Sequence, residues 1–474
     1  MTQETDFNTY QSPFSYRYSG PDMRSYWSQA NFWRKARNIW LNVAEVQMEA
    51  GIVTKEQFKD LQKHVYEISV KRIYELERDP QTGTAHDVMA AIKEFSEKAP
   101  LGGKILQQGL TSEDISSNVE IKIIHDSYDH ILRPKLLDLL SAYAVKIDRY
   151  ENLVCMGYTH EQIAEPTTMG YRLAEWAQDL LIDLKFCDFI RLEIKGKGIK
   201  GPVGTAASVE NALKNTRMSA EELEQKVMKN LGLNYVTIAA QTYPRKYLFL
   251  TMVGLASIGA SLHRSHAMIK HLQAPWIDEV SEPRRKGTTG STAMPHKQNP
   301  VISENICSLT RELPGKLISP WITSAFVTFE RGLEDSAGKK SYLPEAFMTI
   351  DDALTKSEKV ISAMQVHEYM VDANLKKYAP FCATEIILGE LVNAGMDRVE
   401  AHQKLVWVSE QSMQANRLGL PINMKELLIN DKRIMEVLGG YKIKQAFEDI
   451  SRHVGNAPQR CDKFLKEELL PVLE

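Results

Sequence analysis

Apolar residues recur at helical spacing along most of this chain, and strand patterns are rare. Between residues 31 and 50, for example, Trp33, Trp40 and Val43 fall on one face, and Gly51 follows as a stop signal. Directly after it, Thr54 and Gln57 have the spacing of a capping box, which predicts the start of the next helix. Such patterns are typical of amphipathic helices that pack on one side.

The longest helical patterns lie between residues 111 and 361. The segment from Leu248 to Leu272 is apolar over a broad face, which favours burial against several neighbours or at a subunit interface. Only Tyr235–Ile238 has the composition of a strand. We therefore predict an all-α fold with a central long-helix bundle. The three predicted helical domains span residues 1–111, 112–364 and 365–474.

The composition is that of an ordinary soluble protein, with 43% hydrophobic and 25% charged residues and a formal net charge of -3. It gives no reason to expect nucleic acid or an anionic membrane as a partner. No apolar run has membrane-spanning length and the first residues lack a signal-peptide pattern, so we expect a cytoplasmic protein. The five cysteines form no CxxC pair, which predicts reduced thiols. Three nearby histidines (His263, His266, His271) lack a completing ligand, so no metal site is predicted.

The segment from Gly290 to Pro300 has an unusual chemistry for a connection between helices. Its Gly and Pro content predicts a loop. Ser291, Lys297 and Asn299 supply a hydroxyl, a cation and an amide, the groups that can hold an anion and move a proton beside it. A basic surface connection is the alternative on composition alone.

This segment resembles the signature loop of the fumarase/aspartase superfamily, with Thr292 in place of a second serine. Further segments resemble the adenylosuccinate lyase branch, and together they extend over nearly the whole chain. The residues that they contribute are Arg17, Tyr18, His86, Asp87, Thr111, Ser112, Thr159, His160, Gln241, Arg331, Ser336 and Lys340.

Some of these residues also have simpler interpretations. A lone His-Asp pair such as His86–Asp87 is more often solvated than functional. Thr111, the first residue of a TSxD motif, is what a helix cap requires, although two hydroxyls at a helix start also suit a carboxylate. Lys340, next to another lysine, is compatible with a solvated helix face.

The resemblance implies elimination of fumarate from adenylosuccinate, giving AMP, and from the succinyl-aminoimidazole-carboxamide ribonucleotide of purine biosynthesis. It implies Ser291 as the base and His160 as the acid, with Glu304 orienting the imidazole. Lys297 and Asn299 would grip the succinyl carboxylates, and the remaining matched residues, with Asn305, would bind the substrate. The superfamily also implies a homotetramer with shared active sites and no metal or organic cofactor.

The chain departs from the pattern of this branch at five positions. Ile163 and Glu165 replace a Pro and a Gln, whereas Ala85, Asn305 and Lys340 stand where relatives carry an Arg. A lysine is a point charge where an arginine is a forked donor. These changes leave open a sister lyase with a different N-succinyl substrate. A distant alternative from another class is a non-catalytic structural or nucleotide-binding homologue.

Overall fold

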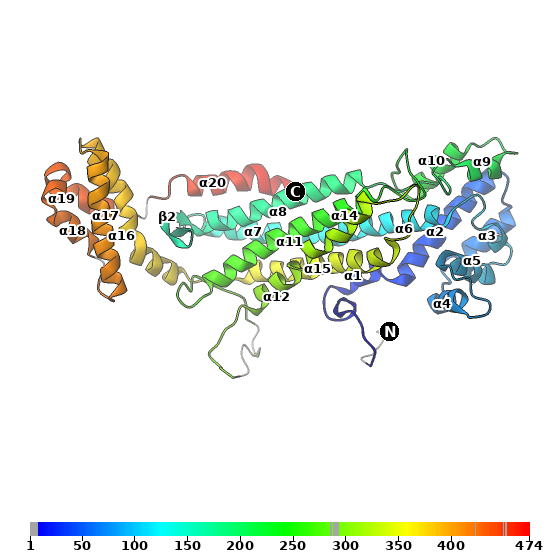
Figure 1. The fold of residues 1–474 in the computed structure, drawn as a ribbon, viewed down its shortest axis with the longest axis horizontal. Coiled ribbons are helices and arrows are strands. Elements are labelled where there is room, and N and C mark those ends of the chain that lie inside the picture. The colour runs from blue at the N-terminus through cyan, green and yellow to red at the C-terminus, as the bar shows by residue number, and fades with distance from the viewer. Residues whose placement is uncertain (1–7, 285–286, 288–292, 422, 449, 451–452) are drawn as a thin grey trace. The chain divides into compact units, whose positions relative to one another are not determined.

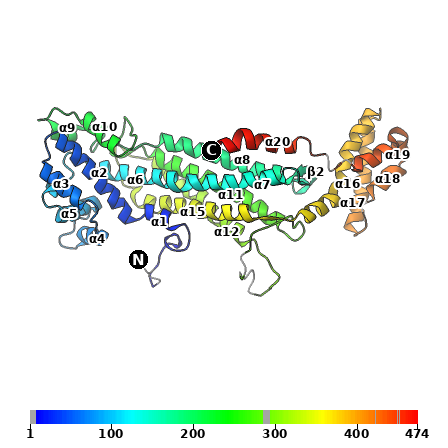
Figure 2. The same cartoon turned by 180° about the vertical axis from the view of Figure 1, so that it is seen from behind.

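The computed structural model describes residues 8–284, 287, 293–421, 423–448, 450 and 453–474. Regular structure in this part of the chain is almost entirely helical (Figures 1 and 2), which confirms the predicted all-α class. The α-helices are α1 (Pro21–Tyr26), α2 (Gln29–Glu49), α3 (Lys55–His64), α4 (Val70–Arg78), α5 (Asp87–Lys98), α6 (Ser112–Ser127), α7 (Arg133–Tyr150), α8 (Met169–Glu193), α9 (Ala207–Leu213), α10 (Ala220–Asn230), α11 (Lys246–Leu272), α12 (Val301–Thr310), α13 (Leu313–Lys316), α14 (Ile318–Ala325), α15 (Ser336–Ala363), α16 (Glu368–Asn393), α17 (Arg398–Arg417), α18 (Met424–Asn430), α19 (Lys432–Glu448), α20 (Ala457–Phe464) and α21 (Leu470–Leu473). The strands are β1 (Val154–Thr159), β2 (Gln162–Thr168), β3 (Val280–Ser281) and β4 (Gln365–Val366).

The chain divides into two compact units, and each is made of three separate stretches. Unit 1 contains residues 1–136, 182–262 and 308–355, and unit 2 contains residues 137–181, 263–307 and 356–474. The long helices α7, α8, α11 and α15 contribute residues to both units. The three contiguous domains predicted from the sequence stay a prediction.

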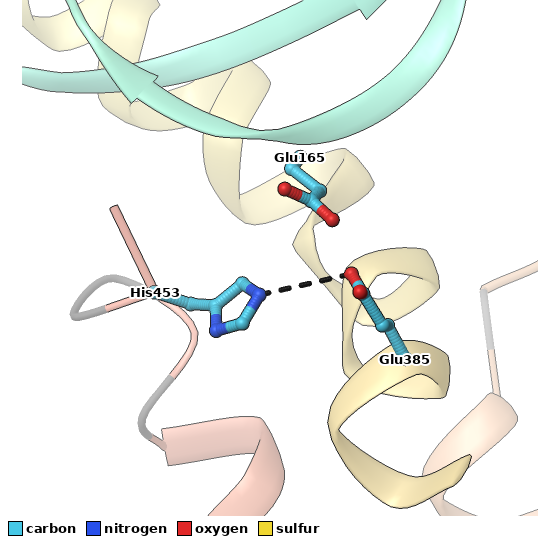
Figure 3. Close-up of side chains that lie close together, drawn as sticks. All are labelled: Glu165, Glu385 and His453. Carbon is cyan, nitrogen blue, oxygen red and sulfur yellow. Dashed lines mark ion pairs between the residues drawn. The ribbon is translucent and has the colours of Figure 1, made fainter. Parts of the chain in front are cut away.

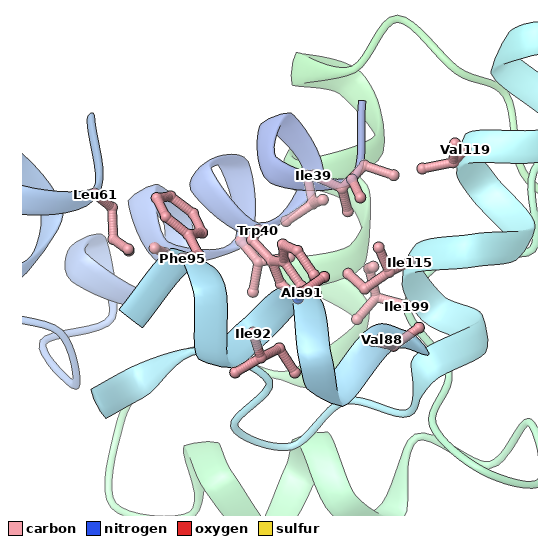
Figure 4. Packing of buried hydrophobic residues seen from close by; sticks show 14 of the residues in the cluster. Ile39, Trp40, Leu61, Val88, Ala91, Ile92, Phe95, Ile115, Val119 and Ile199 are labelled. Carbon is pink, nitrogen blue, oxygen red and sulfur yellow. The ribbon is translucent and has the colours of Figure 1, made fainter. Parts of the chain in front are cut away.

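The core of unit 1 forms where α2 packs against α5 and α6 (Figure 4). Trp40 is only 2% exposed and lies among Phe95, Ile115 and Ile199. The helix starts around this core follow local rules: Ser28 caps α2, and the predicted capping box of Thr54 and Gln57 begins α3. The capping residues thus set where these helices begin, and the apolar face of each helix sets which side packs on the core.

The predicted helix from Leu248 to Leu272 is α11, and its first half packs closely on α8 in unit 1. A Cβ added at Gly254 would lie 3.2 Å from the Cys187 sulfur, so the absent side chain lets the two helices approach. Asp183 on α8 accepts a hydrogen bond of 2.6 Å from Ser261. All five cysteines are free and buried, as expected for reduced structural thiols.

Unit 2 combines the C-terminal helices α16 to α19 with an antiparallel hairpin, β1–β2. Met156 of β1 is fully buried in the same core as Ile387 and Leu405. The hairpin is not predicted by the sequence patterns, and the predicted strand at Tyr235–Ile238 is wrong. There the chain forms only an isolated bridge between Tyr235 and Gly196. Among the described residues, no helix is both long and apolar enough to cross a membrane.

Candidate functional site

His160 occupies the tip of the β1–β2 hairpin. Thr159 pairs with Gln162, so His160 and Glu161 form a two-residue turn, and both have positive φ, 51° and 59°. These angles are those of a type I′ turn, which normally favours Asn and Gly. The turn leaves Thr159 and His160 exposed, with the imidazole presented to solvent on a short ribbon.

Buried contacts fix the base of this hairpin within unit 2. Arg172 donates a 2.7 Å hydrogen bond to the carbonyl of Met156, and its other guanidinium nitrogen lies 3.3 Å from Glu279. Asn374 donates to the same carboxylate at 3.1 Å. Burial raises the pKa of Glu279 despite the opposing effect of Arg172. His160 therefore extends from a ribbon whose base is held by packing, an ion pair and hydrogen bonds.

Ile163 and Glu165, the two residues of β2 that depart from the pattern of the branch, face the C-terminal helices. Ile163 packs against the apolar core that α16 to α19 form. The Glu385 carboxyl of α16 lies beside Glu165 and raises the pKa of the Glu165 carboxyl. The imidazole of His453 lies beside this pair, with 3.8 Å between its Nε2 and a Glu385 oxygen (Figure 3). Both substitutions thus have partners within this chain.

The signature loop is described only in its second half, from Ala293 to Pro300, and Ser291 and Thr292 lie outside the described residues. Lys297 is exposed, and its N–H donates to the carbonyl of Met294 at 3.0 Å. Asn299 is half-buried and precedes α12. Glu282, which the sequence analysis did not single out, caps this helix by accepting N–H donors of Ile302 at 3.1 Å and Ser303 at 2.5 Å.

Helix α12 carries Glu304 and Asn305. Glu304 is exposed. The side-chain oxygen Oδ1 of Asn305 accepts a 2.5 Å hydrogen bond from the Lys356 ammonium. The ammonium of Lys356 therefore places positive charge beside Asn305. Within the described residues of one chain, no hydrogen bond or ion pair joins Glu304 to His160.

In unit 1 the predicted phosphate ligands gather around the start of α15. Arg331 pairs with Glu113 at 3.1 Å and with Asp335 at 3.3 Å. Ser336 is the first residue of α15, and Lys340 follows one turn later with an exposed side chain. Because a helix N-terminus favours negative charge and Arg331 and Lys340 add positive charge, the start of α15 is a candidate position for an anion.

Two more predicted segments contact this region. The N–H of Gln241 donates to the carbonyl of Glu330 at 3.2 Å, next to Arg331. Asp87 at the start of α5 lies 3.6 Å from the Lys340 ammonium and 3.5 Å from the His86 ring. Unit 1 thus brings His86, Asp87, Gln241, Arg331, Ser336 and Lys340 to neighbouring positions from three distant parts of the sequence.

A cavity of about 390 Å³ lies beside Arg331 in unit 1. Arg245 and Tyr342 line it, and both are more than nine-tenths buried. The Arg245 guanidinium lies 3.0 Å from Asp335, which links the segment of residues 241–246 to the start of α15. Of the two lysines, Lys339 is buried and lies 3.1 Å from Glu120, whereas the predicted ligand Lys340 is exposed. Lys339 also lies 4.0 Å from Asp335, and the helical spacing of these two residues is the sequence signal for that pair.

Asp114, the last residue of the TSxD motif, makes several structural contacts. Thr111 and Ser112 form the start of α6, where the Thr111 N–H donates to Asp114 at 2.8 Å. The same carboxylate receives the ammonium of Lys197 at 2.5 Å, and both side chains are fully buried. It also accepts N–H donors of Lys200 and Gly201. Asp114 thereby fixes the segment after α8 to the helix start that carries the two hydroxyls.

Arg17 and Tyr18 belong to an N-terminal segment that is attached to the middle of α15. Ser19 and Gly20, which follow them, both donate hydrogen bonds of 2.7 Å to Asp351. Asp351 is 15 residues after Ser336 on the same helix, a rise of roughly 22 Å. Arg17 is exposed, with its guanidinium 5.9 Å from the Tyr18 ring. In a single chain the anchor of this segment is therefore remote from the start of α15.

Comparison with known proteins first shows the class of protein to which this chain is similar. A family model described as "Lyase" matches residues 22–315, and one described as "Adenylosuccinate lyase C-terminus" matches residues 380–464. The fumarate lyase from Mesorhizobium sp. BNC1 has a similar fold, with a TM-score of 0.82 over 97% of this chain and 100% of that chain, at 20% identity.

Sequence relatives narrow the class to one family. The adenylosuccinate lyase of Saccharomyces cerevisiae is 33% identical over 99% of this chain and 96% of the yeast protein. That of Schizosaccharomyces pombe is 31% identical over the same shares of the two chains. This chain belongs to the adenylosuccinate lyase family of the fumarase/aspartase superfamily.

Proposed function

We propose that the chain eliminates fumarate from adenylosuccinate to give AMP, and from succinyl-aminoimidazole-carboxamide ribonucleotide. The anion site at the start of α15 carries this proposal: Arg331, Ser336 and Lys340 surround a helix N-terminus beside Gln241. Such a site suits the phosphate that both substrates share. The similarity to the two yeast adenylosuccinate lyases supports the same chemistry.

The reaction needs a base and an acid on opposite sides of one bond. A proton leaves the succinyl carbon next to a carboxylate, the electron pair forms the double bond of fumarate, and the C–N bond breaks toward the amine. The departing nitrogen takes up a proton. Negative charge grows on the carboxylate as the first proton leaves, so fixed cations and N–H groups lower the barrier.

We assign the two proton transfers to Ser291 and His160. A serine hydroxyl is a poor base in water, so Ser291 acts as an alkoxide that Lys297 stabilises, while Asn299 and Lys297 hold the succinyl carboxylates. His160 delivers the proton to the leaving nitrogen, and Glu304 orients its ring. The exposed position of His160 at the hairpin tip supports its role toward a substrate held outside its own hairpin.

The assembly that completes this site is a homotetramer in which several chains contribute residues. The exposure of His160, Lys297 and Glu304 in one chain supports this assignment, because catalysis requires them in a site from which water is excluded. The reaction is of the amidine-lyase type and uses no metal or organic cofactor. We place the enzyme in the cytoplasm, where purine nucleotides are made.

Purified protein incubated with adenylosuccinate tests the proposal through the release of fumarate and AMP. His160→Asn should lower kcat by at least about a hundredfold, since a general acid contributes on that order. His402→Asn, which changes an exposed histidine on α17, is the matched control and should retain full turnover. Equal rates for both variants, or release of fumarate only from other N-succinyl compounds, would refute the assignment.

A further inference from the structure

Three side chains of unit 2 converge outside the residues assigned above: Glu165 of β2, Glu385 of α16 and His453, which precedes α20 (Figure 3). Each offers one ligand atom, and these atoms lie within 4.8 Å of one another. They come from segments separated by 220 and 68 residues (165 to 385, and 385 to 453). The fold, and not local sequence, therefore brings two carboxylates and one imidazole together.

The framework around the three side chains is well anchored. Cys382, one turn before Glu385, contacts the carbonyl oxygen of Ala164 at 3.1 Å, which holds α16 beside β2. The N–H of His453 donates to Ile450 at 3.0 Å, and Ile450 is only 3% exposed in the core of unit 2. An open groove of about 660 Å³ runs along Glu165 and Glu385, so a small ion can reach them.

The three side chains bring two carboxylates close to one imidazole, with ligand atoms within 4.8 Å of one another. A cation between the carboxylates would offset the repulsion between two like charges at this distance. Among the described residues, no ion pair joins either carboxylate to a Lys or an Arg, and His453 is the one basic group that pairs with Glu385. A divalent cation would neutralise both carboxylates and use the neutral imidazole as a third ligand.

We propose that Glu165, Glu385 and His453 bind one Zn²⁺ ion. Zinc takes carboxylate oxygen and imidazole nitrogen at about 2.0–2.2 Å, so neighbouring ligand atoms in a tetrahedral site lie roughly 3.4 Å apart. The 3.8 Å between His453 and Glu385 is close to this spacing. The imidazole favours zinc over Mg²⁺ and Ca²⁺, which prefer oxygen ligands. Water fills the fourth position.

The bound ion ties together three segments that otherwise meet through a few polar contacts. One of them, β2, belongs to the hairpin with His160 at its tip, so the ion also stiffens that ribbon. The site is independent of the proposed elimination, because none of its three ligands is assigned a part in that reaction. It also gives Glu165, a departure from the family pattern, a chemical role of its own.

Titration of the metal-free full-length chain with ZnCl₂ alone tests this site, by isothermal titration calorimetry in a thiol-free reducing buffer. We expect one Zn²⁺ per chain. The variants Glu165→Gln, Glu385→Gln and His453→Ala should each weaken binding at least tenfold. Two controls should bind like the parent: His402→Ala, which changes an exposed histidine elsewhere, and Cys382→Ser, which excludes capture by the neighbouring thiol.

Hydrogen exchange supplies a second readout that does not depend on activity. Zinc should slow amide exchange in β2 and in residues 453–464 of the parent, and it should have no such effect in Glu385→Gln. Unchanged zinc affinity in the three ligand variants would overturn the proposal. The absence of binding by the parent at millimolar ZnCl₂, or loss of binding only in Cys382→Ser, would overturn it as well.

Discussion

His160 and its neighbour Glu161 hold the backbone in the left-handed region, which costs an ordinary L-residue about 1–2 kcal/mol. The fold tolerates this strain because β1 is held in place. Met156 is buried, and Arg172 donates a hydrogen bond to its carbonyl. The turn leaves His160 exposed at the tip of the hairpin. Strained residues of this kind are concentrated at functional sites, which supports the role proposed for His160.

Replacement of Glu161 by Gly should relieve this strain. Glycine adopts positive φ freely but loses more entropy on folding, so we expect Glu161→Gly to leave the free energy of unfolding unchanged or raised by up to about 1 kcal/mol. Glu410→Gly, in an exposed position of α17, should instead lower it by roughly 0.5–1 kcal/mol. Urea denaturation of both variants measures this, and an equal loss of stability would contradict the strained turn.

At the scale of elements, Asp114 anchors the helix start that carries two predicted site residues, Thr111 and Ser112. Its carboxylate is fully buried with Lys197 and orders the first turn of α6, where Thr111 and Ser112 begin the helix. An exposed pair such as Lys226 with Glu49 has no such role, because both side chains remain about half exposed. We therefore expect the loss of the buried pair to lower the free energy of unfolding more than the loss of the exposed pair.

Asp114→Asn should lower the free energy of unfolding by about 3–5 kcal/mol, because it leaves the Lys197 charge buried without a partner. Glu49→Gln removes the exposed pair and should cost less than about 1 kcal/mol. Chemical denaturation followed by circular dichroism compares the two directly. Similar losses for both variants would mean that Asp114 does not anchor the segment after α8.

The helices were predictable, because each rests on a local signal. The candidate site residues rest mainly on motifs that resemble the family, and their roles stay predictions. Apolar periodicity located α2 and α11, and a capping box located the start of α3. The β1–β2 hairpin was missed because its turn uses His160 and Glu161 where Asn and Gly would signal it. The contacts of Lys356 with Asn305 and of Glu385 with Glu165 join residues far apart in sequence, which no local pattern encodes.

At the scale of the whole molecule, the assigned residues are divided between the two units. Unit 1 contains the predicted phosphate ligands around the start of α15, and unit 2 contains the hairpin with His160 and the described part of the signature loop. We propose that the phosphate ligands, His160 and the signature loop come from different chains, as closed symmetric oligomers allow.

Mixing two inactive variants tests this account most directly. His160→Asn and Ser291→Ala chains, dissociated together and reassembled in equal amounts, should recover about a quarter of the parent turnover, because random assembly in a symmetric oligomer pairs an intact His160 with an intact Ser291 in one site of four. Native mass spectrometry verifies that mixed oligomers form. Turnover that stays at the level of the separate variants in verified mixed oligomers would contradict a site built from His160 and Ser291 of different chains.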